Sequence, residues 1–161
     1  IILIGFSDGA RNAIQATKNI NIDGLILWNP IFNVSITSIT STHSKKEKFT
    51  FHPLYKIPIK KLLGVGLSVD MIKQIEAENA IDAFEDYKNN ILLLFGEKDK
   101  LTQNVNNHLT SKDLISRNNV DYVIVKNADH LFNKAAYVDE VFDTTINWVI
   151  YNFGEKSEKR K

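Results

Sequence analysis

Four short apolar runs constrain the fold of this 161-residue chain more than any other feature. They are rich in Ile, Leu and Val, they do not alternate with polar residues, and helical stretches separate them: Ile1–Ile4, Leu25–Trp28, Ile91–Phe95 and Tyr122–Val125. A strand buried on both faces of a parallel sheet has this pattern, whereas a half-exposed strand alternates. The sequence therefore predicts an α/β fold with about four parallel strands and flanking helices.

Five stretches between and after these runs are expected to be helical. They are Gly9–Lys18, Val69–Ala80, a short turn at Asp82–Tyr87, Gln103–Arg117 and Lys134–Phe153. The last has the clearest pattern, because its apolar residues recur at intervals of three and four positions. These residues are Ala136, Val138, Val141, Phe142, Ile146, Val149, Ile150 and Phe153. We expect this wide stripe to pack against the sheet.

Residues 31–90 separate the second and third runs. A connection of this length greatly exceeds the usual two to six residues, so it is expected to be a cap-like insertion with structure of its own. Within it, Gly64–Gly66 is expected to be a turn. The whole of 1–154 is then one partial domain, and the charged residues 155–161 are expected to be a disordered basic tail.

Composition excludes several classes of partner. The net charge of +1 comes from 20 basic and 19 acidic residues spread through the chain, so no basic face indicates nucleic acid. The longest apolar runs are far shorter than the ~20 residues of a membrane span. The chain has no cysteine, which rules out disulfides and a thiolate nucleophile and allows a reducing compartment. We expect a cytoplasmic location.

The first run ends in Gly5-Phe6-Ser7-Asp8-Gly9, which matches the G-x-S-x-G pattern of a sharp turn that presents a nucleophilic serine. Both glycines are expected to be steric necessities of that turn. The backbone N–H of Asp8 would be an oxyanion-hole donor. A serine hydroxyl needs a base and a third group that orients the base, so the motif predicts an acid and then a histidine further along. The alternative is a glycine-rich turn in which Ser7 caps the next helix.

Asp99 is the candidate acid. It follows the run Ile91–Phe95, which Gly96 ends, and catalytic groups gather at the carboxyl ends of strands in open α/β sheets. Glu97 on the same loop is close enough to compete. An Asp in such a loop can also be a turn residue or a helix N-cap.

His130 is the candidate base, because it follows the fourth run in "VIVKNADHLF". His108 lies in a predicted helix, while His43 and His52 precede the acid, which breaks the chain order of serine, acid and histidine. Asp129 is adjacent to His130, and adjacent side chains diverge. We therefore expect Asp129 to be a turn residue.

Four segments in order, "GFSDGA", "LILWNP", "ILLLFGEKD" and "VIVKNADHLF", resemble the α/β-hydrolase family from its nucleophile elbow to its last helix. The stretch "AIDAFEDYKNNILLLFGEKDKLT" looks most like its esterase, feruloyl-esterase and serine-aminopeptidase-like branch. The resemblance implies Ser7 as nucleophile, Asp99 as acid and His130 as general base and acid, with no metal and no cofactor.

The resemblance also implies that the given sequence is the C-terminal part of that fold. The family places four strands before the elbow and takes a second oxyanion donor from the loop after the third of them. The first run would then be an edge strand, able to pair with a missing N-terminal segment or with another chain. Right-handed connections would place the helices after Ser7, Pro30 and Leu101 on one face and the last helix alone on the other.

Three functional hypotheses follow. The first is a serine hydrolase that cleaves a small carboxylic ester, thioester or amide through an acyl-enzyme. The second is a non-catalytic or split fragment that acts as an association surface. The third, a Rossmann or flavodoxin-like binding domain, would need a G-x-G-x-x-G loop, which "GFSDGARN" lacks. Five apolar residues could line a pocket or simply pack in the core: Trp28, Phe51, Tyr55, Leu62 and Leu63.

Overall fold

The computed structural model describes residues 1–32, 50–62, 65–77 and 80–154. Contacts between residues divide the chain into two units, Ile1–Phe32 with Ala80–Lys161, and Asn33–Asn79. The first unit contains a four-stranded sheet and the second a three-stranded sheet. The expected tail, 155–161, lies outside the described residues.

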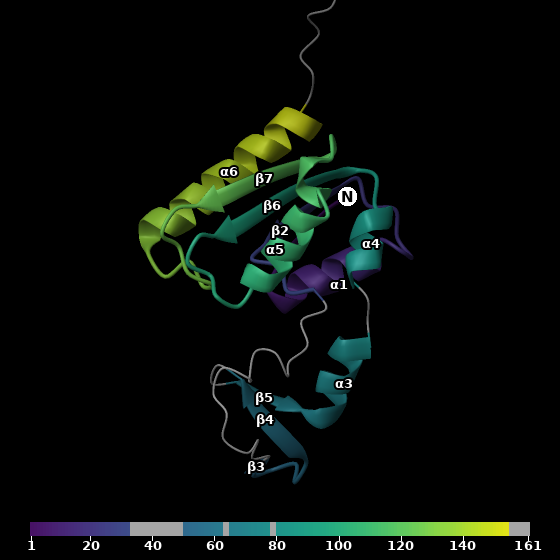
Figure 1. The fold of residues 1–161 in the computed structure, drawn as a ribbon, viewed down its shortest axis with the longest axis vertical. Coiled ribbons are helices and arrows are strands. Elements are labelled where there is room, and N and C mark those ends of the chain that lie inside the picture. Colours follow the sequence, from purple (N-terminus) through teal and green to yellow (C-terminus); the bar gives the residue numbers. More distant parts are fainter. Residues whose placement is uncertain (33–49, 63–64, 78–79, 155–161) are drawn as a thin grey trace, which may run out of the picture. The chain divides into compact units, whose positions relative to one another are not determined.

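The sheet of the first unit is parallel throughout and has the order β1-β2-β6-β7 (Figure 1). Its strands are β1 (Ile2–Phe6), β2 (Gly24–Trp28), β6 (Asn90–Gly96) and β7 (Val120–Val125). Phe6 is aligned with Trp28, and Trp28 with Leu94, so the carboxyl ends of the strands lie along one edge of the sheet. The predicted α/β class with four parallel strands is confirmed.

Helices cover both faces of this sheet (Figure 1). On one face lie α1 (Asp8–Ala16), α4 (Ala80–Asp86) and α5 (Gln103–Ser111), and on the other lies α6 (Ala135–Phe153). Each of the first three lies in the connection between one strand of the sheet and the strand beside it, and these connections all proceed from β1 towards β7. Right-handed connections that proceed in one direction place their helices on one face of the sheet. The helix expected over Gln103–Arg117 ends earlier, and a 3-10 turn over Leu114–Ser116 follows it.

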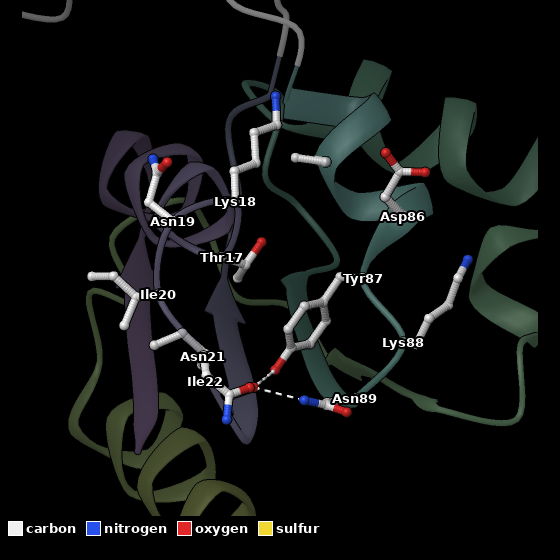
Figure 2. Close-up of a pocket in the computed structure, with 11 residues that line it drawn as sticks. Thr17, Lys18, Asn19, Ile20, Asn21, Ile22, Asp86, Tyr87, Lys88 and Asn89 are labelled. Atoms are coloured by element: carbon white, nitrogen blue, oxygen red, sulfur yellow. Dashed lines mark hydrogen bonds between the residues drawn. The ribbon is translucent and has the colours of Figure 1, made fainter.

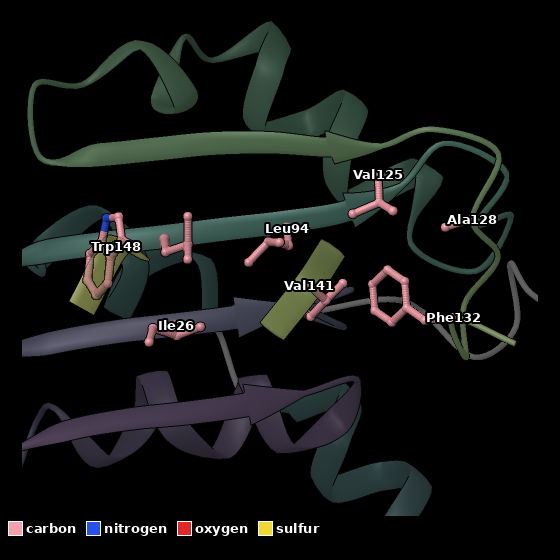
Figure 3. Packing of buried hydrophobic residues seen from close by; sticks show 8 residues of the cluster. Ile26, Leu94, Val125, Ala128, Phe132, Val141 and Trp148 are labelled. Carbon is pink, nitrogen blue, oxygen red and sulfur yellow. The ribbon is translucent and has the colours of Figure 1, made fainter. Parts of the chain in front are cut away.

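The core explains why the strands are apolar at consecutive positions. Figure 3 shows the cluster beneath α6, which contains Ile26, Leu92, Leu94, Val125, Ala128, Phe132, Val141 and Trp148. Side chains alternate along a strand, so the intervening Leu25, Leu27 and Leu93 face the other helices, and all three are fully buried. The central strands β2 and β6 are therefore buried on both faces.

The apolar stripe of α6 extends beyond the side of the helix that is buried against the sheet. Val141, Thr145 and Trp148 are buried, as the expected packing on the sheet requires. Phe142, Ile146 and Ile150, by contrast, are 50%, 52% and 63% exposed. Phe142 still contacts the sheet, because its ring packs against that of Trp28 in β2 with centroids 5.6 Å apart. The expectation that the whole stripe packs against the sheet is therefore wrong for Ile146 and Ile150, which are mostly exposed.

The second unit contains β3 (Thr50–Phe51), β4 (Pro58–Leu62), β5 (Val65–Ser68) and α3 (Val69–Ala77). Its strands are antiparallel, in the order β3-β4-β5. The sequence predicted structure here but no strands, because the runs are short and interrupted by Lys and Pro. Gly66 lies within β5 rather than in a turn, while Gly64 lies outside the described residues.

Residues 80–90, which the sequence grouped with the insertion, belong to the first unit. Ala80, Ala83 and Phe84 of α4 are buried there, and the ring of Phe84 packs against that of Phe32 with centroids 5.6 Å apart. Of the helix expected over Val69–Ala80, α3 contains Val69–Ala77, Ala80 is the first residue of α4, and 78–79 lie outside the described residues.

Candidate active site

Ser7 lies in the turn between β1 and α1, with φ 55° and ψ −121°. A positive φ is uncommon for serine, and it persists only where the surroundings hold it. The end of β2 does so here. The N–H of Ser7 donates to the carbonyl of Trp28 at 2.9 Å, and the N–H of Ile31 donates to the carbonyl of Ser7 at 3.1 Å. The nucleophile turn is therefore fixed to the neighbouring strand.

The two glycines of the motif differ in their surroundings. A Cβ at Gly5 would lie 2.5 Å from the Cα of Ala10 and 2.6 Å from the carbonyl oxygen of Gly9, so no side chain fits there. A Cβ at Gly9 would meet no described atom within 4 Å. The steric argument made from the sequence is therefore wrong for Gly9 in the described part of the chain.

The structure brings Ser7, His130 and Asp99 together at the carboxyl ends of β1, β7 and β6. The Oγ of Ser7 is 2.8 Å from Nε2 of His130, and Nδ1 of His130 is 2.8 Å from Oδ2 of Asp99. The Ser7 side chain makes no capping hydrogen bond to α1. The alternative reading of Ser7 as a helix cap is therefore not supported.

Asp99 is held as a carboxylate. Its side chain has no exposed surface, and burial alone would raise its pKa. Hydrogen bonds from His130, from the hydroxyl of Thr102 at 2.5 Å and from the N–H of Leu101 at 2.9 Å outweigh burial, so the pKa of Asp99 lies below its usual value. The acid stays charged while it faces the imidazole.

The loop that carries His130 packs directly against the end of β6. A Cβ at Gly96 would lie 2.6 Å from the carbonyl oxygen of Ala128, so only glycine permits this approach. The N–H of Lys98 donates to that same carbonyl at 2.8 Å. On its other side, the ring of His130 lies beside that of Phe6, with centroids 5.4 Å apart. The imidazole is thus confined between two strand ends.

The other candidate acids do not take the place of Asp99. Glu97 accepts the N–H of Asn127 through Oε2 at 2.8 Å. Asp129 accepts the backbone and side-chain N–H groups of Asn133 at 3.2 and 2.5 Å, as a turn residue does.

The other histidines lie elsewhere. His108 is in α5, and the ring of His52, in the second unit, packs against that of Tyr55. His43 lies outside the described residues.

Asp8 is the first residue of α1. The first N–H groups of a helix have no acceptor within the helix and lie at its positive end. The Asp8 carboxylate is paired with Arg11, whose Nε lies 2.9 Å from Oδ1 and whose Nη2 lies 3.5 Å from Oδ2. The side chain is therefore held by its own helix, while its backbone N–H directly follows the nucleophile.

Sequence reasoning missed two polar residues of this region, Asn29 and Thr102. Thr102, which is 1% exposed, supports the acid as described above. Asn29 is fully buried at the end of β2 and bonds to the loops of both His130 and Asp99. Its position in the sequence could have identified it, because Asn29 directly follows a buried strand, as the loops of the acid and the base also follow strands.

A hollow of about 580 Å³ lies at the opposite, amino end of the sheet, and Figure 2 shows residues that line it. Its lining consists of Thr17–Ile22, Ala83 and Asp86–Asn89. Tyr87 and Asn89 both donate to the carbonyl of Ile22 there, at 2.9 and 2.8 Å. A smaller hollow of about 250 Å³ includes Asp99 and Thr102 in its wall. The larger hollow is therefore remote from the triad.

The described residues include no group of three His, Asp or Glu side chains that could hold a metal ion. None of the helices in that part of the chain has the length and apolar character that crossing a membrane requires.

No protein-family model and no curated protein matches the sequence. Solved structures do match. The esterase domain of a Rhodothermus marinus protein has a TM-score of 0.66 at 15% identity over 92% of this chain and 60% of its own. Est1E from Butyrivibrio proteoclasticus, also solved with ferulic acid bound, scores 0.62 at 18% identity over 92% and 61%. Mouse alpha/beta hydrolase domain-containing protein 10 scores 0.59 at 18% over 93% and 62%.

These likenesses show that the chain has the α/β-hydrolase fold, as its sequence resemblance implied. The chain spans about 60% of the length of each of these structures.

Proposed function

We propose that this chain, folded as an α/β hydrolase, carries the nucleophile, base and acid of a serine hydrolase that cleaves a carboxylic ester, thioester or amide. One observation carries the proposal. An unbroken line of hydrogen bonds, each 2.8 Å long, runs from the hydroxyl of Ser7 through His130 to the carboxylate of Asp99. A serine hydroxyl that a base activates, with a third group orienting the base, has this arrangement.

In the proposed acylation step, the Oγ of Ser7 attacks the carbonyl carbon of the substrate while Nε2 of His130 takes the hydroxyl proton. The carbonyl electrons move to oxygen, and the backbone N–H of Asp8 donates to that oxyanion. Nε2 then gives its proton to the leaving alcohol, thiol or amine as the bond to carbon breaks. Asp99 accepts the Nδ1–H throughout, which fixes the ring and stabilises the imidazolium.

Deacylation repeats these steps with water. Nε2 of His130 removes a proton from the water, whose oxygen attacks the acyl carbon, and the same proton returns to Oγ of Ser7 as the acid leaves. Both half-reactions need only one base at one place, which the half-buried imidazole supplies. No oxidant, reductant or second protein base enters the balance.

An ester is the first substrate class to test. An alcohol or phenol is a better leaving group than an amine, so ester cleavage makes the smallest demand on His130 as an acid. A p-nitrophenyl ester tests nucleophile and base alone, because p-nitrophenolate leaves without a proton. Methyl ferulate is a second test substrate, since Est1E, which has the same fold, is known with ferulic acid bound.

Covalent labelling tests the proposal directly. We expect a fluorophosphonate probe to modify Ser7, identified by peptide mass, and Ser7→Ala to abolish the label. His130→Gln should slow labelling by about 10⁴-fold, the loss typical of a triad member. The matched control is His108→Gln, which should label at the normal rate. Absence of label in this chain and in any longer protein that contains it would contradict the proposal.

A second candidate function is association through the outer edge of β1. This strand ends the described sheet, and its Ile4 is 53% exposed. Exposed apolar side chains on an edge strand favour pairing with another strand. We propose that a preceding segment of a longer protein or a second copy of this chain pairs there.

Light scattering of the purified chain tests pairing with a second copy. Self-association that Ile4→Lys abolishes would support it, and a monomer at high concentration would contradict it.

A further inference from the structure

Asn29 occupies the point where the three loops of the candidate active site meet. It is fully buried and follows β2 with φ 41°. The residue before it and the second residue after it hold the nucleophile turn, since the carbonyl of Trp28 and the N–H of Ile31 bond to the backbone of Ser7. Its own N–H donates to the carbonyl of Leu94 in β6 at 2.8 Å. The backbone around Asn29 is therefore tied to β1 and β6.

The side chain of Asn29 reaches the other two loops. Its Oδ1 accepts the N–H of Gly96 at 2.7 Å, at the start of the loop that carries Asp99. Its Nδ2 donates to the carbonyls of Asp129 and His130, at 3.3 and 2.9 Å. Both amide hydrogens and the amide oxygen thus have partners, all of them backbone groups.

From these contacts we infer that Asn29 is a positioning residue: its buried amide joins the loops of the acid and the base, and the backbone on either side of it holds the nucleophile turn. The inference rests on the proposed function, because it explains how Ser7, Asp99 and His130 are kept at reacting distance. Asn29 itself does not touch the reacting atoms. It acts through the backbone of the three loops that carry them.

The chemistry of this position selects asparagine. The amide orientation is fixed by its partners, because the flipped amide would place its N–H groups against the N–H of Gly96 and its oxygen against two carbonyls. Asparagine also tolerates positive φ better than other residues with a side chain. Aspartate has the same shape but no N–H, so its carboxylate would face the carbonyls of Asp129 and His130. Glycine would keep the backbone and lose every side-chain bond.

A small displacement of the base loop is expected to matter. His130 makes two hydrogen bonds of 2.8 Å, and both lengthen if the carbonyl of His130 loses its donor. Misplacing a catalytic group by about 1 Å can cost about a hundredfold in rate. We therefore expect kcat to fall, with KM little changed, because Asn29 is fully buried and the bonds described here are all to backbone groups.

Two variants, Asn29→Asp and Asn29→Gly, test the inference in the full chain. Asn119→Ala is the matched control. Its amide also donates to two backbone carbonyls, those of Tyr87 at 3.4 Å and Asn89 at 2.8 Å, but at the amino end of the sheet. The readouts are the rate of fluorophosphonate labelling at Ser7, kcat and KM for p-nitrophenyl acetate, and the downfield proton NMR signal of Nδ1–H, assigned with His130→Gln.

We expect both Asn29 variants to lower labelling rate and kcat by about a hundredfold with KM within about twofold, and to shift or broaden the Nδ1–H signal. Asn119→Ala should change none of these. Normal labelling and a normal Nδ1–H signal in the Asn29 variants would overturn the inference. If circular dichroism shows that one of the two variants is unfolded, the other variant alone tests the inference. If neither the wild-type chain nor a longer protein that contains it labels, the proposed function is contradicted instead, and the NMR signal then decides the role of Asn29.

Discussion

At the carboxyl end of the four-stranded sheet, four residues other than glycine have positive φ, namely Ser7, Asn29, Asn127 and Phe132. The connection from α5 to β7 has one such residue, Asp113, and at the amino end the chain turns around side chains that bond to carbonyls. Arg117 donates to the carbonyls of Phe84 and Tyr87 and lies 5.4 Å from the centre of the Phe84 ring. The carboxyl end holds more of the residues with positive φ and a buried carboxylate, and at the amino end side chains bond to the ends of helices and loops.

The difference shows where this fold stabilises itself and where it holds reactive groups. Strained residues and buried charge cost free energy, so they persist only where the surrounding structure holds them. The amino end has hydrogen bonds from guanidinium, amide and phenol groups to backbone carbonyls, each contributing about 1 kcal/mol. We therefore expect substitutions at the two ends to separate activity from stability.

The largest effect is expected for Asp99→Asn at the carboxyl end. The amide cannot hold the Nδ1–H tautomer of His130 as a carboxylate does, so kcat for p-nitrophenyl acetate should fall by about 10⁴-fold. Glu97→Gln, on the same loop, is the control and should keep kcat within about threefold. Comparable losses in the two variants would show that the acid was misassigned.

Arg117→Ala tests the amino end. It removes hydrogen bonds to three backbone carbonyls, those of Phe84, Glu85 and Tyr87, and the contact with the Phe84 ring, so the free energy of unfolding should fall by about 2 kcal/mol. Urea denaturation measures this, and kcat of the folded variant should be unchanged. A large loss of kcat would mean that the two ends of the sheet are coupled, which would break the comparison.

A smaller effect on the free energy of unfolding is expected when the pH is lowered. The pKa of Asp99 in the folded chain lies below its ordinary value of about 3.9, so the unfolded chain binds more protons at acid pH. The contribution of Asp99 to stability is therefore complete above about pH 4 and is lost as pH falls through the folded-state pKa. The free energy of unfolding of the native chain should fall more between pH 6 and pH 3 than that of Asp99→Asn. An equal fall in both would contradict the assigned shift.

The smallest effect is expected on the exposed side of α6. Ile150→Gln should change the free energy of unfolding by no more than about 0.5 kcal/mol, because Ile150 is 63% exposed. Trp148→Ala, on the buried side of the same helix, should cost about 3–5 kcal/mol. A large cost at Ile150, measured by urea denaturation, would mean that another surface covers that side.

Local patterns predicted much of this molecule. The non-alternating runs marked β1, β2, β6 and β7. Strands buried on both faces must be apolar at consecutive positions, and β2 and β6 are buried in this way, whereas β1 and β7 are only partly buried. Parallel strands also bring their carboxyl ends to one edge, so the order of serine, acid and histidine was enough to name three residues that the structure brings together.

The wrong predictions share one cause, because each concerns a property that depends on residues distant in the sequence. The space around Gly9 and the exposure of Ile146 depend on what lies opposite them, and a local pattern does not contain this. The same holds for α4, whose residues the sequence placed in the insertion but which pack in the first unit. Asn29 was missed because an asparagine before a proline reads as an ordinary turn.

The sequence by itself determined which chemical groups stand at the ends of which strands. It could not determine their distances, because Ser7 and His130 are 123 positions apart, and a hydrogen bond requires its atoms to lie within about 3 Å. Only the tertiary structure decided this, since β1 and β7 do not touch in the sheet and their loops are joined through the end of β2. One buried amide, that of Asn29, makes the last of these connections.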